Sequence, residues 1–125
     1  MPALPKEVSA GWDDRKGPVI FATVNQEGVP NAIYASCVSK FSEDKLVIAD
    51  NYFDKTRANI ESGSPGSILF MTNAGKAYQV KGSVERHTSG EIYEDMLEWC
   101  NDKHPRHAAA VLNVEEVYSG AEELV

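Results

Sequence analysis

The alternation of hydrophobic and polar residues predicts a chain made mostly of strands. Residues 17–24 (GPVIFATV) are rich in β-branched and aromatic side chains, which favour extended backbone. The turn NQEG at 25–28 leads back into a second predicted strand at 29–41. A third predicted strand at 46–50 (LVIAD) is almost entirely apolar, which indicates that both of its faces are covered.

Three more strands are predicted in the second half of the chain, at 67–72, 77–87 and 108–120. Most neighbouring strands are joined by connections too short for the crossover helices of a parallel sheet. Six antiparallel strands with short hairpins favour a closed barrel, because closure removes exposed sheet edges. The expected fold is therefore mainly β, with helices flanking a six-stranded antiparallel barrel.

Three short helices are predicted beside this barrel. Apolar residues at helical spacing predict the first helix near residues 4–12. The second is predicted at 54–62, with Gly63 at the C′ position. Thr88 followed by Glu91 has the form of a capping box, which predicts that a third helix begins with Thr88 as its N-cap.

The length and charge of the chain narrow the possible partners. The 125 residues fit one domain, 1–125, and their formal net charge of −7 disfavours nucleic acid or an anionic membrane as the main partner. No apolar run reaches the roughly 20 residues that a membrane span needs. The N-terminal residues also lack the apolar core of a secretion signal. We therefore expect a cytoplasmic protein.

The sequence contains no strong metal-binding or catalytic motif. Cys37 and Cys100 lie far apart, and two buried free thiols are favoured over a single disulfide, which stays open as the alternative. His104 and His107 flank Pro105, which interrupts a helix, so we predict no metal site. No residue stands out as a catalytic acid or base, and the catalytic residues stay unassigned.

The start of the helix predicted at 54–62 carries an unusual set of side chains. Helix N-termini favour acids, because their free N–H groups carry partial positive charge, yet Lys55 and Thr56 stand in this first turn. Asn59 lies one turn further along the same side. An ammonium, a hydroxyl and free N–H groups together favour a bound phosphate. The alternative is that these residues are merely solvated.

The predicted strand at 29–41 has small and polar residues at its centre. Tyr34 and Ser36 interrupt its apolar pattern, and Ala35, like Ala49 of the next strand, is small. Such residues would let a flat ring approach the backbone closely. The alternative interpretation is the ordinary alternation of a half-exposed strand.

Three segments, GPVIFATVNQEGVPNAIYASCV, KLVIADNYFDKTRANIES and KAYQVKGSVE, resemble the pyridoxamine 5′-phosphate oxidase-like family. The resemblance covers residues 4–118 and is strongest to the short FMN-binding proteins of that family. It implies a split β-barrel that forms a homodimer and binds FMN at the subunit interface. It also implies that the final strand and residues 104–107 complete the site of the partner subunit.

The resemblance also implies a set of cofactor-binding residues. Lys55 and Thr56 match positions that hold the FMN phosphate, and Asn59 matches an asparagine that fixes the loop. The residues matching the segments that line the flavin are Tyr34, Ala35, Ser36, Ile48, Ala49, Asp50 and Asn51.

The chain departs from the family pattern at two of these places. Some relatives carry Asn, Thr and Trp at 34–36, and Ala35 lacks a hydroxyl that could reach the phosphate. Asp50 is unusual in its segment. An acid facing the flavin ring would disfavour the anionic reduced form and lower its potential.

The function implied by this resemblance is an FMN-binding redox or electron-transfer protein, or a small flavin-dependent reductase. FMN would supply the redox chemistry, and the protein would bind and orient it. The alternative is a dimeric barrel without enzymatic activity that binds haem or another small ligand, with His107 as the expected haem ligand. The substrate, electron donor and acceptor are left open.

Overall fold

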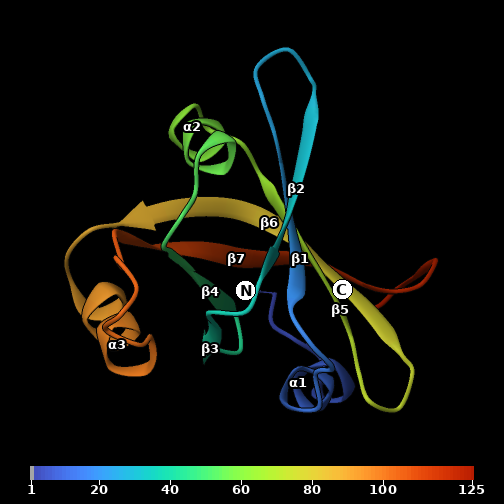
Figure 1. Ribbon diagram of the computed structural model, residues 1–125. Helices are drawn as coiled ribbons and strands as arrows, with labels where there is room; N and C mark the ends of the chain where they lie inside the picture. Colours follow the sequence, from blue (N-terminus) through green and yellow to red (C-terminus); the bar gives the residue numbers. More distant parts are fainter. Residues whose placement is uncertain (1) are drawn as a thin grey trace.

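The structure is a computed structural model that describes residues 2–125 as one strongly curled antiparallel sheet with three helices (Figure 1). No helix in this range is long and apolar enough to cross a membrane. The elements are α1 (Lys6–Asp13), β1 (Val19–Val24), β2 (Pro30–Ala35), β3 (Val38–Ser42), β4 (Lys45–Asp50), α2 (Lys55–Glu61), β5 (Gly66–Met71), β6 (Ala77–His87), α3 (Glu91–Trp99), β7 (Ala108–Ser119) and β8 (Glu122–Glu123).

The strand order shows why the sheet curls into a split barrel. Strands run in the order β2-β1-β5-β6-β7-β4-β3, and the short β8 pairs with β7. The two outermost strands, β2 and β3, are consecutive in the chain and are joined only by Ser36 and Cys37. Because the three positions from Ala35 to Val38 span at most about 11 Å, the opposite edges of the sheet must come together.

The prediction of a single strand at 29–41 is therefore wrong in detail. The segment forms β2 and β3, so the barrel has seven main strands, not six, besides β8. A tight bend divides it, where the Val38 amide donates to the carbonyl of Ser36 at 3.1 Å. The alternation of apolar and polar residues continues through this bend. It therefore does not reveal that the chain passes here from one edge of the sheet to the other.

The core lies on both sides of the curled sheet. The larger cluster fills its inside and includes Trp12 of α1, whose ring meets Phe70 edge-on with 5.3 Å between centroids. The smaller cluster lies under α3 and includes Val47 and Met96. Residues 46–50 of β4 are all buried, which confirms the prediction that both faces of this strand are covered.

The end of α2 is as predicted from the sequence, whereas the start of α3 is not. Gly63 follows α2 with φ +93°, as expected for a C′ glycine. The helix α3 instead has Gly90 as its N-cap, with φ +92° and no side-chain capping bond. The capping box at Thr88 is therefore wrong, because β6 continues to His87 and the glycine alone makes the turn into the helix.

Candidate functional site

A pocket of about 270 Å³ lies where the β2–β3 connection faces the end of β4. Its walls are mostly small or aromatic side chains, which suits a flat ligand. The lining residues are Ile33, Tyr34, Ala35, Ser36, Cys37, Ala49, Asn51, Tyr52, Phe53 and His104.

Five of the residues expected to contact a cofactor line this pocket together. Tyr34 and Ala35 end β2 and Ser36 follows them, whereas Ala49 lies near the end of β4 and Asn51 follows that strand. They are brought together because β2 and β3 close the sheet next to β4. The two groups of residues are separated in the sequence by the β3–β4 hairpin and come together only in the folded sheet.

Two other expected residues, Ile48 and Asp50, do not line the pocket. They alternate with Ala49 and Asn51, so their side chains leave β4 on the opposite face. Ile48 belongs to the large core cluster and is 1% exposed. The side chain of Asp50 is fully buried at 0% exposure.

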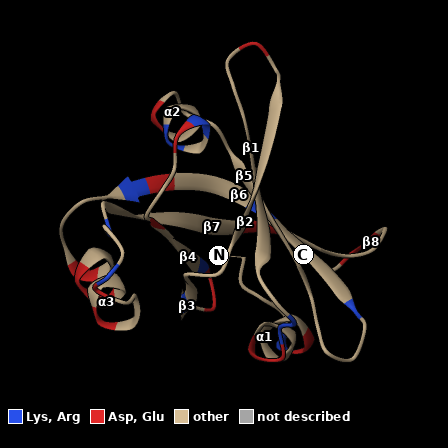
Figure 2. Cartoon of the chain, viewed as in Figure 1, with Lys and Arg blue, Asp and Glu red and all other residues tan. Residues whose placement is uncertain are grey.

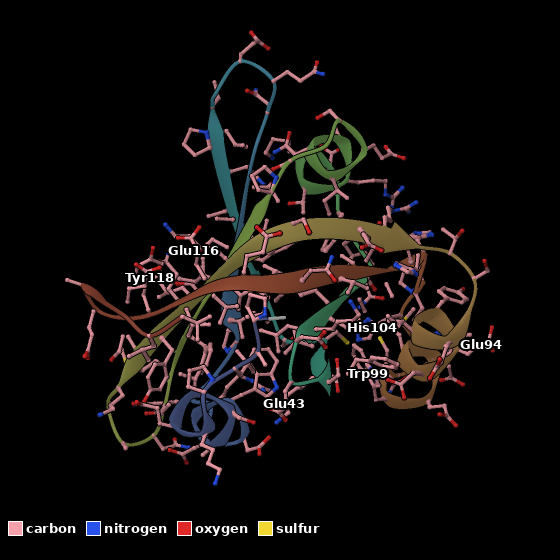
Figure 3. All side chains as sticks on the ribbon, turned by 180° about the vertical axis from the view of Figure 1, so that it is seen from behind. Glu43, Glu94, Trp99, His104, Glu116 and Tyr118 are labelled. Atoms are coloured by element: carbon pink, nitrogen blue, oxygen red, sulfur yellow. The ribbon has the colours of Figure 1, made fainter. Side chains whose placement is uncertain are left out.

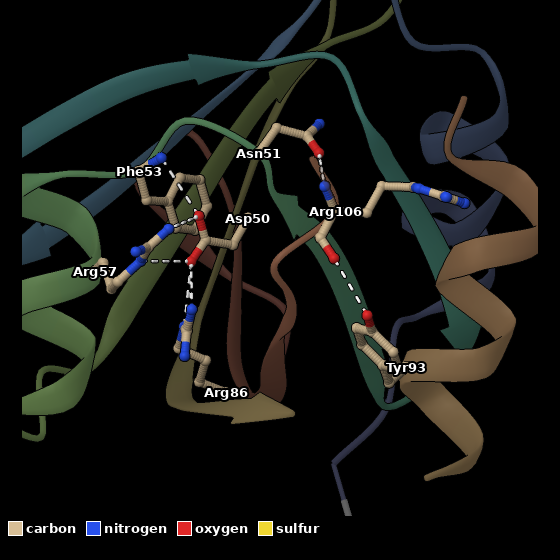
Figure 4. Close-up of polar contacts among 7 residues, drawn as sticks. All are labelled: Asp50, Asn51, Phe53, Arg57, Arg86, Tyr93 and Arg106. Atoms are coloured by element: carbon tan, nitrogen blue, oxygen red, sulfur yellow. Dashed lines mark hydrogen bonds and ion pairs between the residues drawn. The ribbon is translucent and has the colours of Figure 1, made fainter. Parts of the chain in front are cut away.

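Asp50 is the centre of an ion-pair cluster (Figure 4). Its carboxylate accepts hydrogen bonds from Arg57 Nε at 2.9 Å and Nη2 at 3.1 Å, and from Arg86 Nη2 at 3.0 Å and Nε at 3.1 Å. The Phe53 amide donates a fifth bond at 3.3 Å. These bonds to Asp50 raise the pKa of the Arg57 guanidinium. The cluster therefore fastens α2 and the loop before it to β4 and β6.

The helix α2 begins next to the pocket. Phe53 lines the pocket, and Lys55 begins the helix two residues later. Lys55 is exposed, and its ammonium makes no hydrogen bond or ion pair with any residue in the range 2–125. Thr56 is 1% exposed and its hydroxyl oxygen accepts a bond from Asn31 Nδ2 of β2 at 3.1 Å.

Asn59 ties α2 to the sheet instead of facing the pocket. Its Nδ2 donates to Thr23 Oγ1 of β1 at 3.0 Å, and both side chains are buried. Asn59→Ala leaves a buried hydroxyl without this partner, so it is expected to lower the free energy of unfolding by about 1–3 kcal/mol. Urea unfolding measures the loss, and Glu61→Ala on the exposed side of α2 is the control. An unchanged midpoint for Asn59→Ala would contradict this role.

The loop after α3 completes the pocket from within the same chain. His104 lies where this loop meets the strands (Figure 3), and its Nδ1 is 3.3 Å from the hydroxyl of Tyr52. Arg106, with φ +49°, donates its amide to Asn51 Oδ1 at 3.0 Å, and its carbonyl accepts a bond from Tyr93 at 3.3 Å (Figure 4). These contacts place His104 at the pocket of its own chain, and the expectation from the resemblance that residues 104–107 complete the partner's site stays a prediction.

Both basic and acidic residues lie on α2 and at the end of β6 (Figure 2). Lys55, Arg57 and Arg86 lie there, and only the carboxylate of Asp50 is paired with the two arginines. Acidic residues also lie on α3, away from α2 (Figure 2). The ammonium of Lys55 makes no ion pair with any described residue, so it is the cation of this group that could pair with an anionic group.

The comparison with known proteins agrees with this geometry. A family model described as pyridoxamine 5′-phosphate oxidase matches residues 4–119. The chain belongs to the pyridoxamine 5′-phosphate oxidase-like family of FMN-binding split barrels.

Solved structures show the same split-barrel fold. HupZ from Group A Streptococcus superimposes with a TM-score of 0.80 at 23% identity, over 93% of each chain. An FMN-binding protein from Syntrophomonas wolfei gives 0.73 at 16% identity, over 90% of this chain and 83% of that one. A heme binding protein from Mycobacterium smegmatis gives 0.73 at 17% identity, over 94% of this chain and 53% of that one. At such identities these likenesses concern the fold alone.

Sequence reasoning missed several residues of this family member's site. Tyr52 and Phe53 line the pocket, and Arg57 and Arg86 pair with Asp50. The sequence did contain a signal for the arginines, because a carboxylate in an apolar strand is stable only when a cation is paired with it. No comparable signal marks Tyr52 and Phe53.

Proposed function

We propose that this protein binds FMN as a redox or electron-transfer protein, or as a small flavin-dependent reductase. The main support for the proposal is the pocket of small and aromatic residues, whose lining residue Phe53 lies two positions before the exposed Lys55 at the start of α2. A flat wall and a free cation fit the two chemical halves of FMN, a planar ring and a phosphate. The FMN-binding members of the family support the same choice of ligand.

The ring end of the proposed site is the part lined by β2 and β4. Ala35, Ser36 and Ala49 have short side chains, so a ring can approach the backbone amides and carbonyls of these strands. Tyr34 and Tyr52, 76% and 74% exposed, flank the opening and can stack on a ring. FMN would supply the electron-transfer chemistry, and these side chains would orient it and exclude water from one face.

The phosphate end of the proposed site is the start of α2. Lys55 would pair with the phosphate, and Arg57 would add positive charge although Asp50 already engages its guanidinium. The buried hydroxyl of Thr56 is held by Asn31, so in this arrangement it positions the helix. The Asp50 cluster keeps the first turn of α2 beside the pocket.

A second copy of the chain is part of the proposal. The pocket, at about 270 Å³, is smaller than the roughly 300–1,000 Å³ of most ligand sites, so one chain would cover only part of an FMN. Tyr34, Ile20 and Leu69 stand side by side across β2, β1 and β5, and Tyr34 and Leu69 are 76% and 38% exposed. This apolar row borders the pocket at Tyr34, so a homodimer that buries it would close the site.

Haem is the second candidate ligand. His104 lines the pocket and offers an imidazole nitrogen there, and the neighbour from Mycobacterium smegmatis is a heme binding protein. His107, the histidine expected from the sequence, is exposed and does not line the pocket. In this alternative His104 would therefore be the residue that binds the haem iron.

The test of the phosphate site is Lys55→Ala. A charge-assisted contact with a phosphate contributes about 1.5–3 kcal/mol, so the dissociation constant for FMN is expected to rise about 10- to 100-fold. Fluorescence titration of FMN measures it. Lys76→Ala, which removes an exposed lysine of the β5–β6 turn, is the control and should bind FMN as the wild type does. Equal affinities for both variants would remove Lys55 from the site.

A further inference from the structure

The two cysteines, 63 positions apart in the sequence, meet in the fold. Their Sγ atoms lie 3.2 Å apart, and both thiols are free. Cys37 belongs to the β2–β3 connection and Cys100 follows the last residue of α3. A disulfide bond is about 2.05 Å long, so the sulfur atoms need to approach by only about 1 Å to be joined.

The two thiols differ in how they can be reached. Cys37 is half-buried and lines the pocket. Cys100 is 3% exposed and lies behind it. Burial, aided by the contact with Cys37, raises the pKa of the Cys100 thiol to about 11. Because the thiolate is the reactive form, a reagent in solution would meet Cys37 first.

We propose that Cys37 and Cys100 are a thiol–disulfide exchange site whose reaction partner is a small-molecule disulfide entering through the pocket. The accessible Cys37 is the attacking thiol, and the buried Cys100 is the resolving thiol. The exchange itself needs only the two sulfur atoms and the opening beside them, but this opening is the pocket proposed for the flavin ring, so the small disulfide would enter when the pocket holds no FMN.

The exchange balances without any further oxidant. Cys37 gives its proton to solvent and attacks one sulfur of the small disulfide, whose S–S bond breaks and releases one small thiolate. Cys100 then loses its proton and attacks Cys37 Sγ, and the second small thiolate leaves. The two released thiolates take up two protons, so two protein thiols are oxidised while one small disulfide is reduced to two thiols.

The 3.2 Å separation makes the second step efficient. A nucleophile held at contact distance reacts as if it were present at very high concentration, which offsets the low thiolate fraction of Cys100. The product would join the β2–β3 connection to α3. Asn51, which contacts Cys100 at 3.7 Å and lines the pocket, lies beside the new bond.

Equilibration of the full-length protein with mixtures of reduced and oxidised glutathione tests the proposal. After acid quenching and alkylation, intact mass and peptide mapping should show both thiols lost together, with Cys37 linked to Cys100 within one chain. Excess reduced glutathione should restore both thiols. The oxidised form is expected to melt about 10 °C higher, because the bond closes a long loop. A glutathione adduct that persists on Cys37, or a link between two chains, would overturn the proposal.

Single variants test the order of the two steps. Cys100→Ser should stop with one glutathione on Cys37, whereas Cys37→Ser should keep a free thiol at Cys100 under the same conditions. Modification of Cys100 in Cys37→Ser at the rate of the wild type would overturn the assigned roles. If a variant does not fold, a time course on the wild type decides. An adduct on Cys37 before the link supports the order, and an adduct on Cys100 contradicts it.

Discussion

Asp50→Asn is expected to lower the free energy of unfolding by about 3 kcal/mol. The side chain is fully buried, and its carboxylate accepts bonds from Arg57 and Arg86. Asparagine keeps the shape of the side chain but removes its negative charge. Its NH2 group can only donate hydrogen bonds, as guanidinium groups also do, so it cannot replace a carboxylate oxygen as an acceptor. Both arginines would lose their counter-charge, and the hold of α2 on the sheet would weaken.

Urea unfolding of Asp50→Asn beside Asp54→Asn measures this effect. Asp54 lies four residues away, is exposed and makes no side-chain capping bond, so its replacement should change the free energy of unfolding by less than about 0.5 kcal/mol. A shifted midpoint for Asp50→Asn alone is expected. If both variants unfold like the wild type, the Asp50 cluster does not hold α2 in place.

Gly82→Ala is expected to cost more than about 4 kcal/mol, enough to prevent stable folding. A Cβ at this position would lie 1.6 Å from the carbonyl oxygen of Asn113, which is backbone. The pairing of β6 with β7 shifts register between Lys81 and Gly82, and the missing side chain lets the two strands approach closely at this bulge. No rotamer change can relieve a clash with the backbone of a paired strand.

Circular dichroism and thermal melting of Gly82→Ala measure the loss, with Ser83→Ala as the control. Ser83 is the next residue of β6 and its side chain is exposed, so its replacement should have an effect below about 0.5 kcal/mol. A Gly82→Ala protein that melts like the wild type would show that β6 and β7 separate here without cost.

Much of the fold could be predicted from local patterns. The apolar run at 46–50 is buried on both faces, and the glycine after α2 adopts the expected positive φ. These features depend on neighbouring residues, which periodicity and turn chemistry describe directly.

The closure of the barrel and the partners of the buried site residues depend on contacts between residues far apart in the sequence. Local patterns of hydrophobic and polar residues do not predict such contacts. The bend at Ser36 and Cys37 brings two sheet edges together, and only the strand order reveals it. The buried Asp50 needed cations, but the sequence offers many arginines and lysines and does not say which ones fold against it. The meeting of Cys37 with Cys100 likewise follows from how α3 lies on β4 and β7.

The visible absorption spectrum of the purified protein, with released cofactor identified by mass, shows whether the protein binds FMN. We expect a flavin spectrum and FMN at about one molecule per chain, or binding of added FMN to the same level. A Soret band would contradict it in favour of haem and direct attention to His104. A colourless protein that does not bind added FMN would leave the split barrel intact but remove the proposed cofactor.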